Sequence, residues 1–197
     1  MAREVELKAI VPDLTLAVAR VLEAAGEARC AARLEDRRYD TPDRALALRD
    51  HVLRLRVYRG DVPDGRLDWK GPTTYVDGYK VREEHSVTVG DPDELATMLE
   101  RLGYVVTREI DREIRQFTVH GAVVRFERYP RLDDLVEVEG EPTAIEAAIL
   151  VLALPRETFT TGRLPDFVRD YEARTGQRAA LCDRELDGDY RYSATDA

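Results

Sequence analysis

Several short segments of this chain alternate charged and apolar residues, and the charged positions are the ones that could do chemistry. In the segment E-V-E-L-K, Glu4, Glu6 and Lys8 would share one side of a strand, because successive side chains along a strand point to opposite faces. Carboxylates on neighbouring strands offer the hard oxygen ligands that Mg²⁺ and Mn²⁺ prefer. Arginine and lysine offer forks and point charges for phosphoryl oxygens. Both kinds of side chain around one space would suit a metal–polyphosphate complex.

The same alternation recurs along the chain in sets of two or three charged residues. These sets are Arg54 and Arg56; Arg66, Asp68 and Lys70; Lys80, Arg82 and Glu84; Arg125 and Glu127; and Glu137 and Glu139. Two interpretations are open: the charged faces point outward, as in an ordinary half-buried sheet, or inward to a hydrophilic interior. The opposite faces, such as Leu53, Leu55 and Val57, are apolar and could be covered by helices. This favours the inward arrangement, in which the charges must pair with one another, with metal or with ligand.

Turn residues and hydrophobic periodicity divide the chain into strands and helices. We expect strands at 2–11, 28–40, 52–59, 66–70, 78–89, 104–119, 122–129 and 135–139, and helices at 13–25, 91–102, 141–152 and 164–175. Short turns predict an α+β fold with an antiparallel β-barrel of about eight strands, which forms a hydrophilic tunnel wrapped by amphipathic helices. No linker divides the chain, so residues 1–182, including C-terminal helices from about 141, are expected to form a single domain. Residues 183–197 are expected to be a polar, poorly ordered tail.

The bulk composition narrows the class of partner. The chain has 197 residues and a net charge of −9, which argues against nucleic acid or an anionic membrane as partner but allows a small anionic substrate. No apolar run is long enough to span a bilayer, and the N-terminus has no apolar segment typical of a secretory signal. Cys30 and Cys182 have no metal-ligand spacing. We therefore expect a cytoplasmic protein with free thiols, as a monomer or a homodimer.

Six motifs, taken in order, resemble the CYTH family, also called triphosphate tunnel metalloenzymes. They are E-V-E-L-K (4–8), Y-D-T-P (39–42), L-R-L-R (53–56), W-K-G-P (69–72), K-V-R-E-E (80–84) and V-E-V-E (136–139). The resemblance covers about residues 3–140 and is similar to the class IV adenylate cyclase-like and thiamine triphosphatase-like branch. It implies a tunnel enzyme that depends on Mg²⁺ or Mn²⁺ and acts on a small-molecule triphosphate or nucleotide.

The resemblance also implies roles for individual residues. The expected metal ligands are Glu4, Glu6, Glu127, Glu137 and Glu139, where Glu127 stands at a position that is usually Asp in the family. The expected substrate contacts are Lys8, Arg54, Arg56, Lys70, Arg82, Arg112 and Arg125. Lys8 and Glu84 are expected to be catalytic, with Glu84 orienting the basic residues or the metal-bound water.

Two positions depart from the family pattern. Ile110 stands where a lysine precedes Arg112 in the family, and Ser86 stands where many relatives have a third carboxylate. Three functions remain open. The leading hypothesis is a metal-dependent hydrolase of inorganic triphosphate, thiamine triphosphate or a nucleoside triphosphate. The alternatives are a class IV adenylate cyclase that forms cyclic AMP and pyrophosphate, and a non-catalytic module that binds a triphosphate or nucleotide.

Overall fold

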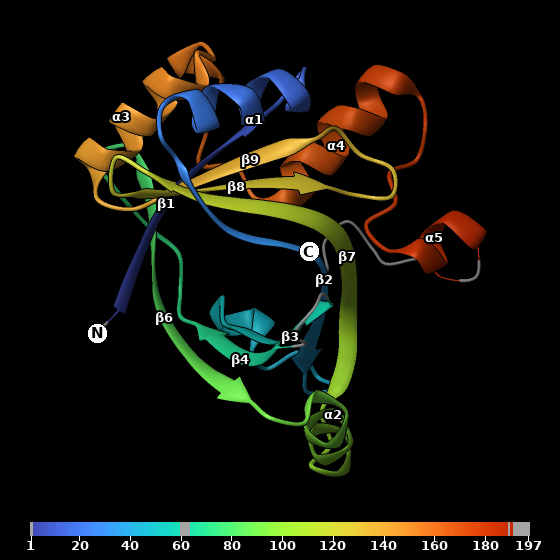
Figure 1. Cartoon of the computed structure of the whole chain (residues 1–197). Coiled ribbons are helices and arrows are strands. Elements are labelled where there is room, and N and C mark those ends of the chain that lie inside the picture. Colours follow the sequence, from blue (N-terminus) through green and yellow to red (C-terminus); the bar gives the residue numbers. More distant parts are fainter. Residues whose placement is uncertain (1, 60–63, 189, 191–197) are drawn as a thin grey trace.

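Nine antiparallel strands form the body of the molecule in the computed structural model, which describes residues 2–59, 64–188 and 190 (Figure 1). The strands are β1 (Ala2–Ile10), β2 (Glu27–Asp40), β3 (Val52–Arg59), β4 (Asp64–Lys70), β5 (Thr74–Val76), β6 (Tyr79–Val89), β7 (Val105–Val119), β8 (Ala122–Arg128) and β9 (Leu135–Glu139). Their order is β1-β9-β8-β7-β2-β3-β4-β6-β5, and β1 also pairs with β6. Eight strands therefore close into a ring, and β5 is added to β6 outside it.

The ring places β1 and β2 on opposite walls. Counting through β9, β8 and β7, or through β6, β4 and β3, β2 lies four strands away from β1 in either direction. On one wall, Lys8 of β1 pairs in register with Glu137 of β9, and Glu4 pairs with Arg82 of β6. On the other wall, Arg38 of β2 pairs with Arg54 of β3. Charged side chains from both walls therefore meet across the enclosed space.

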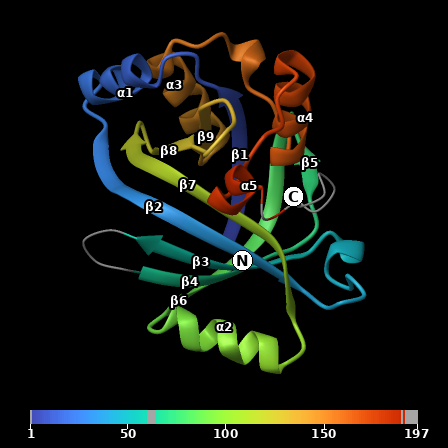
Figure 2. The same cartoon turned by 90° about the vertical axis from the view of Figure 1, so that its right-hand side faces the viewer.

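Five α-helices accompany the strands in the described part of the chain. They are α1 (Leu14–Glu23), α2 (Pro92–Arg101), α3 (Pro142–Leu152), α4 (Leu164–Thr175) and α5 (Asp183–Asp187), together with the 3₁₀ turns η1 (Ala47–Arg49) and η2 (Arg156–Thr158). Asp13 and Asp91 cap α1 and α2, since each carboxylate accepts a hydrogen bond from a backbone N–H in the first turn, at 2.9 Å. Figures 1 and 2 show α1 and α3 on one side of the ring, α2 at the opposite end and α4 on a flank.

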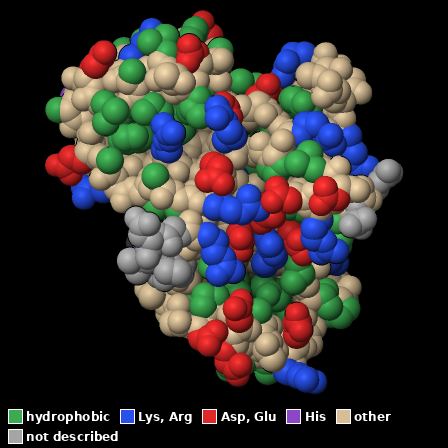
Figure 3. Space-filling view, turned by 45° about the vertical axis from the view of Figure 1, so that its right-hand side comes forward, with side chains coloured by type: hydrophobic (Ala, Val, Ile, Leu, Met, Phe, Trp, Pro, Cys, Tyr) green, Lys and Arg blue, Asp and Glu red, His purple; other side chains and the backbone are tan. Residues whose placement is uncertain are grey.

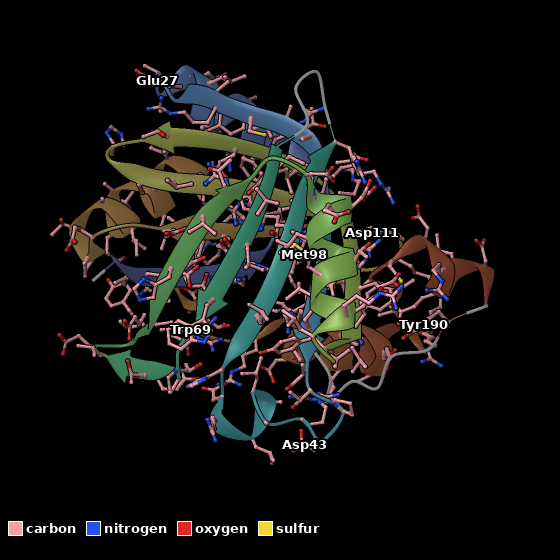
Figure 4. All side chains as sticks on the ribbon, turned by 90° about the horizontal axis from the view of Figure 1, so that it is seen from below. Glu27, Asp43, Trp69, Met98, Asp111 and Tyr190 are labelled. Carbon is pink, nitrogen blue, oxygen red and sulfur yellow. The ribbon has the colours of Figure 1, made fainter. Side chains whose placement is uncertain are left out.

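The helices cover the apolar outer faces of the strands. The largest core cluster joins Leu7 of β1, Phe126 of β8 and Val138 of β9 to Val21 of α1 and Ile145 of α3. A second cluster packs Leu99 of α2 on Leu55 of β3, and a third packs Phe167 of α4 near Leu135 of β9. Figure 4 looks at the molecule from the α2 side, with Met98 on α2 and Trp69 on β4, between β3 and β6.

These clusters decide which way the charged faces point. Because Leu53 and Leu55 pack in the cluster with Leu99 of α2, Arg54 and Arg56, at the alternate positions of β3, point into the ring, where they are buried. The expected α+β fold, with a ring of antiparallel strands around a hydrophilic interior, is therefore confirmed. Two local expectations were wrong. Residues 74–76, which lie outside the expected strands, form β5 against β6, and Arg66 on the charged side of β4 is exposed near the start of that strand.

The C-terminal segment also differs from the expected poorly ordered tail at its beginning. Residues 183–187 form α5, which is held on the outer faces of β2 and β7 by charge pairs. Asp183 pairs with Arg33 at 2.7 Å and Arg184 pairs with Glu109 at 3.0 Å. The carboxylate of Glu185 accepts a hydrogen bond from the Leu181 backbone N–H at 2.6 Å. Figure 3 shows acidic and basic side chains interleaved across the middle of this face, and residues 191–197 lie outside the described part.

Among the described residues, no helix is both long enough and apolar enough to cross a bilayer.

The packing of α3 gives a stability prediction. Ile145 is fully buried between α3 and the strands, whereas Leu150 on the same helix is 81% exposed. We expect Ile145→Ala to lower the free energy of unfolding by about 2–5 kcal/mol, through lost burial and a residual cavity. Leu150→Ala should change it by less than about 0.5 kcal/mol. Urea denaturation of both variants measures the difference, and equal effects would contradict this assignment of the core.

Candidate active site

A cavity of about 230 Å³ lies inside the ring. Its lining contains eleven Lys and Arg residues and six Asp and Glu residues, and the carboxylates of Glu4, Asp68 and Glu84 pair with the lining residues Lys70 and Arg54. Basic side chains therefore outnumber acidic ones in the lining, although the net charge of the chain is −9, and the surrounding strands strengthen their attraction for an anion. The cavity is therefore suited to a compact, multiply charged anion.

One end of the cavity is bounded by the chain between β2 and β3 and by the start of α4. The Asp40 carboxylate orders this connection by accepting hydrogen bonds from the backbone N–H groups of Thr41, Leu46 and Ala47, at 2.7–2.9 Å. Leu164 and Pro165 of α4 line the same end. The connection that follows the Y-D-T-P motif thus has a defined position beside the cavity. The hydrogen bonds that it donates to Asp40 explain why the motif has an acidic residue at this position.

Three buried carboxylates gather on the β1–β9 wall. One carboxylate oxygen of Glu4, one of Glu6 and one of Glu137 lie within 4.8 Å of one another. Such a group of like charges is unstable unless cations surround it. Here the ammonium groups of lysines provide that charge: Lys70 bonds Glu4 at 2.5 and 2.6 Å, Lys80 bonds Glu6, and Lys8 bonds Glu137. An oxygen-only donor set of this kind fits a hard divalent cation such as Mg²⁺ or Mn²⁺.

The electrostatics of this wall follow from burial and from the lysines. Burial alone would raise the pKa of Glu4 and Glu137, but Lys70 lowers the pKa of Glu4, and Lys8 and Arg125 hold the pKa of Glu137 well below its ordinary value. Glu139 behaves in the opposite way. Burial, followed by repulsion from Glu137 and Glu4, raises the pKa of Glu139 to about 7. Glu139 thus carries the carboxyl group on this wall that takes up a proton near neutral pH.

The opposite wall is built around two buried aspartates. Asp68 accepts hydrogen bonds from Nη2 of Arg54 at 2.8 Å and from Ser86 at 2.7 Å. Asp36 accepts from Nη1 of Arg112 at 3.0 Å, and Arg54 and Arg56 each approach it at 3.4 Å. These carboxylates hold in place the guanidinium groups of Arg54, Arg56 and Arg112, which line the cavity. They are the supports of the basic wall.

Three more of the expected site residues, Glu127, Arg125 and Arg82, also lie in the interior, and each has its own hydrogen-bond partners. Glu127 lies away from the three-carboxylate group and accepts from Arg112 at 2.9 Å and from the Tyr129 hydroxyl at 2.6 Å. Arg125 bonds Glu137 at 2.8 Å. Arg82 donates to the backbone carbonyls of Gly71 and Asp50, both at 2.7 Å. Glu127 is thus positioned to hold Arg112, and its role as a metal ligand stays a prediction.

Glu84 lies between the two walls. Its carboxylate is 3.3 Å from Lys70 and 3.8 Å from Arg54. Burial raises its pKa above the ordinary range, against the attraction of Lys70 and with repulsion from Glu4 and Asp68. This position suits a group that orients cations from both walls.

Several interior residues were not among the expected site residues. Asp36, Arg38 and Lys80 line the cavity, and Asp68 is buried beside it. Alternation along β2 could have indicated Asp36 and Arg38, since both share a face with Asp40. Lys80 and Asp68 belonged to alternating sets that were recognised without a role. Ile110, at the position of the family lysine, lines the cavity and also joins the α4 core cluster.

A family model described as the CYTH domain matches residues 2–149. A protein from Vibrio parahaemolyticus, whose name proposes an adenylate cyclase, shares 20% identity and a TM-score of 0.71, over 84% of this chain and 97% of that chain. The Pyrococcus horikoshii protein PH1819 shares 24% identity and a TM-score of 0.67, over 85% and 98%. No curated protein matches the sequence.

A further solved structure covers more of this chain. It is a Hippeastrum protein, named as an adenylyl cyclase candidate that reveals a dominant triphosphatase activity. It shares 15% identity and a TM-score of 0.60, over 92% of this chain and 99% of that chain. At these identities the structures share the fold with this chain.

The raised pKa of Glu139 gives a pH prediction. A carboxyl group whose pKa is higher in the folded state than in the unfolded state stabilises the fold while protonated, and this contribution is lost as the pH rises from about 4.5 to about 7. The unfolding free energy of the metal-free protein should therefore contain a component that falls between about pH 4.5 and pH 7, and Glu139→Gln should remove it.

The control is the exposed neighbour Glu141. Urea denaturation at several pH values should give the same pH dependence for Glu141→Gln as for the wild type. An unchanged pH dependence in Glu139→Gln would contradict the assignment of this titration to Glu139.

Proposed function

Because the chain belongs to the CYTH family, we propose that it is a metal-dependent hydrolase of a triphosphate compound, which it binds inside the ring of strands. The observation that carries the proposal is the pairing of two walls across one cavity. Glu4, Glu6 and Glu137 lie together on one wall, and Arg54, Arg56 and Arg112 lie on the other. A metal–triphosphate complex presents positive charge on one side and anionic oxygens on the other, so it complements both.

The division of tasks follows from the contacts. Glu4, Glu6 and Glu137 would hold Mg²⁺ or Mn²⁺, which when bound polarises phosphoryl oxygens and lowers the pKa of water. Lys8 and Lys70 now bond carboxylates of that group, and with substrate and metal present their ammonium groups can turn to phosphoryl oxygens. Catalysis of this kind consists mainly of positioning and charge stabilisation.

The arginine wall provides the positioning. Asp68 and Asp36 fix the guanidinium planes before substrate arrives, which reduces the ordering cost of binding. Glu84 contacts Lys70 and Arg54 and would hold these two basic side chains in a fixed position relative to each other. Arg82 is fixed by two backbone carbonyls and retains N–H donors for the substrate.

A panel of substrates tests the proposal. Purified protein with Mg²⁺ or Mn²⁺ should release phosphate from at least one of tripolyphosphate, thiamine triphosphate and ATP, measured as free phosphate. Release of cyclic AMP with pyrophosphate from ATP would identify a cyclase instead. Tight triphosphate binding by calorimetry, with no product after hours, would identify a binding module.

The carboxylate group gives the first prediction on activity. Glu6→Gln and Glu137→Gln should each abolish metal-dependent phosphate release, because each removes one charge from the proposed metal site. Glu83 neighbours Glu84 on β6, and its side chain, 40% exposed, pairs with His85. Glu83→Gln is therefore the matched control and should keep wild-type activity. Normal turnover in Glu6→Gln or Glu137→Gln would remove that residue from the site.

The arginine wall gives the second prediction on activity. Arg54→Ala should weaken triphosphate binding by about 1.5–3 kcal/mol, the value of a hydrogen bond to a charged group. Isothermal titration calorimetry measures the change, with thermal unfolding as a check that Asp68 tolerates the loss of its partner. Unchanged affinity would show that Arg54 serves only its carboxylate partners Asp68, Asp36 and Glu84.

A further inference from the structure

The end of the cavity beside α4 is a junction of three chain segments that lie far apart in the sequence. They are the connection between β2 and β3, the connection between β4 and β5, and the residue that directly precedes α4. That residue is Arg163, whose Nη2 donates to the Asp50 carboxylate at 3.1 Å and to the Thr73 hydroxyl at 2.9 Å. Figure 2 shows β5, which follows Thr73, beside α4. One guanidinium nitrogen thus joins all three segments.

These contacts converge on Asp50. The carboxylate oxygen that accepts from Arg163 also accepts from the backbone N–H of Thr73, at 2.6 Å. Burial would raise the pKa of Asp50, but the hydrogen bonds from Thr73 and the charges of Arg163 and Arg82 lower it, which keeps the carboxylate ionised. The backbone of Asp50 has φ 55°, in the left-handed region that few residues with a side chain adopt. The hydrogen bonds to its side chain therefore help to hold a backbone conformation that is costly by itself.

The backbone of the same residue holds Arg82. The Asp50 carbonyl accepts a hydrogen bond from Nη2 of Arg82 at 2.7 Å, and the Gly71 carbonyl accepts one from Nε at 2.7 Å. Arg82 is buried, lines the cavity and is an expected contact of the triphosphate. A change in the backbone conformation of Asp50 would therefore change the orientation of the Arg82 guanidinium.

The pair of Arg163 and Asp50 is better suited to fixing a position than to stabilising the fold. The two side chains are 44% and 35% exposed, and an ion pair at such exposure contributes little to stability because water screens it. Both residues line the cavity, although none of the six sequence motifs includes either of them. The effect of the pair is therefore expected in the binding of a ligand more than in the free energy of unfolding.

We propose that Arg163 is a positioning residue of the active site, which acts through Asp50 to hold Arg82 in the orientation that binds a phosphoryl group. This inference rests on the proposed function and adds a residue to that site. No contact between Arg163 and the substrate is required. The effect of Arg163 passes through the Asp50 side chain and its carbonyl to Arg82, so it is lost when either link is broken.

The affinity for linear tripolyphosphate with Mg²⁺, measured by calorimetry, tests the proposal in a double-mutant cycle. Arg163→Gln should weaken binding about tenfold, which corresponds to the loss of one charge-assisted hydrogen bond. In an Arg82→Gln background, the same substitution should change the affinity by less than about twofold, because the two residues act through one link. Equal losses in both backgrounds would show that Arg163 acts independently of Arg82 and would overturn the proposal.

A second variant, Asp50→Asn, separates positioning from simple attraction between charges. Asparagine tolerates the left-handed region as aspartate does, so the substitution mainly removes the charge that holds Arg163. The loss of a negative charge from the cavity lining would by itself tighten the binding of an anion. Positioning predicts the opposite, a loss of affinity of roughly threefold or more. Tighter binding by Asp50→Asn would overturn the proposal.

Arg174 provides the matched control, and the wild type separates this inference from the proposed function. Arg174 lies in the last turn of the same helix, is 57% exposed and pairs with Asp133 at 2.7 Å, but it does not line the cavity. Arg174→Gln should therefore keep the wild-type affinity for tripolyphosphate. Wild-type protein that fails to bind tripolyphosphate would contradict the proposed function itself. Normal binding by the wild type and by Arg163→Gln alike would overturn only the role of Arg163.

Discussion

The structure depends on confining ionised side chains of both signs within a closed ring of strands. Burying a charge costs free energy that only another charge, a metal or a ligand can offset. The interior meets this requirement through a network in which Lys8, Lys70 and Lys80 compensate three carboxylates on one wall, while two aspartates hold the arginines on the other. The ion pairs that offset the cost of burying these charges therefore also position the side chains that could bind a metal and a polyanion.

The apolar outer surface of the ring is the second half of this arrangement. Leu7 of β1 and Val138 of β9 pack in the cluster with α1 and α3, and Leu55 of β3 packs with α2, so these strands bury apolar side chains on one face and charged side chains on the other. A strand could not turn its charges outward without exposing this apolar surface to water. The helices thus fix the direction of the charged side chains, and through them the geometry of the cavity.

Much of the fold could be predicted from the sequence, because alternation is unambiguous along short strands. The bounds of β3, β9 and α4 agree with those expected. The α5 helix was missed because its stability comes from ion pairs with β2 and β7, distant in sequence. At the site, the family motifs indicated Glu4, Glu6 and Glu137, but they could not show that Glu127 bonds Arg112 and Tyr129 instead of joining that group. Partner choice among buried charges depends on three-dimensional proximity, which periodicity does not contain.

The central claim is that the three-carboxylate group binds a metal inside the ring. A crystal structure of the protein with Mn²⁺ and tripolyphosphate, with Mn²⁺ located by its anomalous scattering, tests this most directly. We expect an anomalous peak coordinated by Glu4, Glu6 and Glu137, with phosphoryl density between it and Arg54. Manganese bound only at the outer surface, with the cavity free of phosphoryl density, would contradict the account.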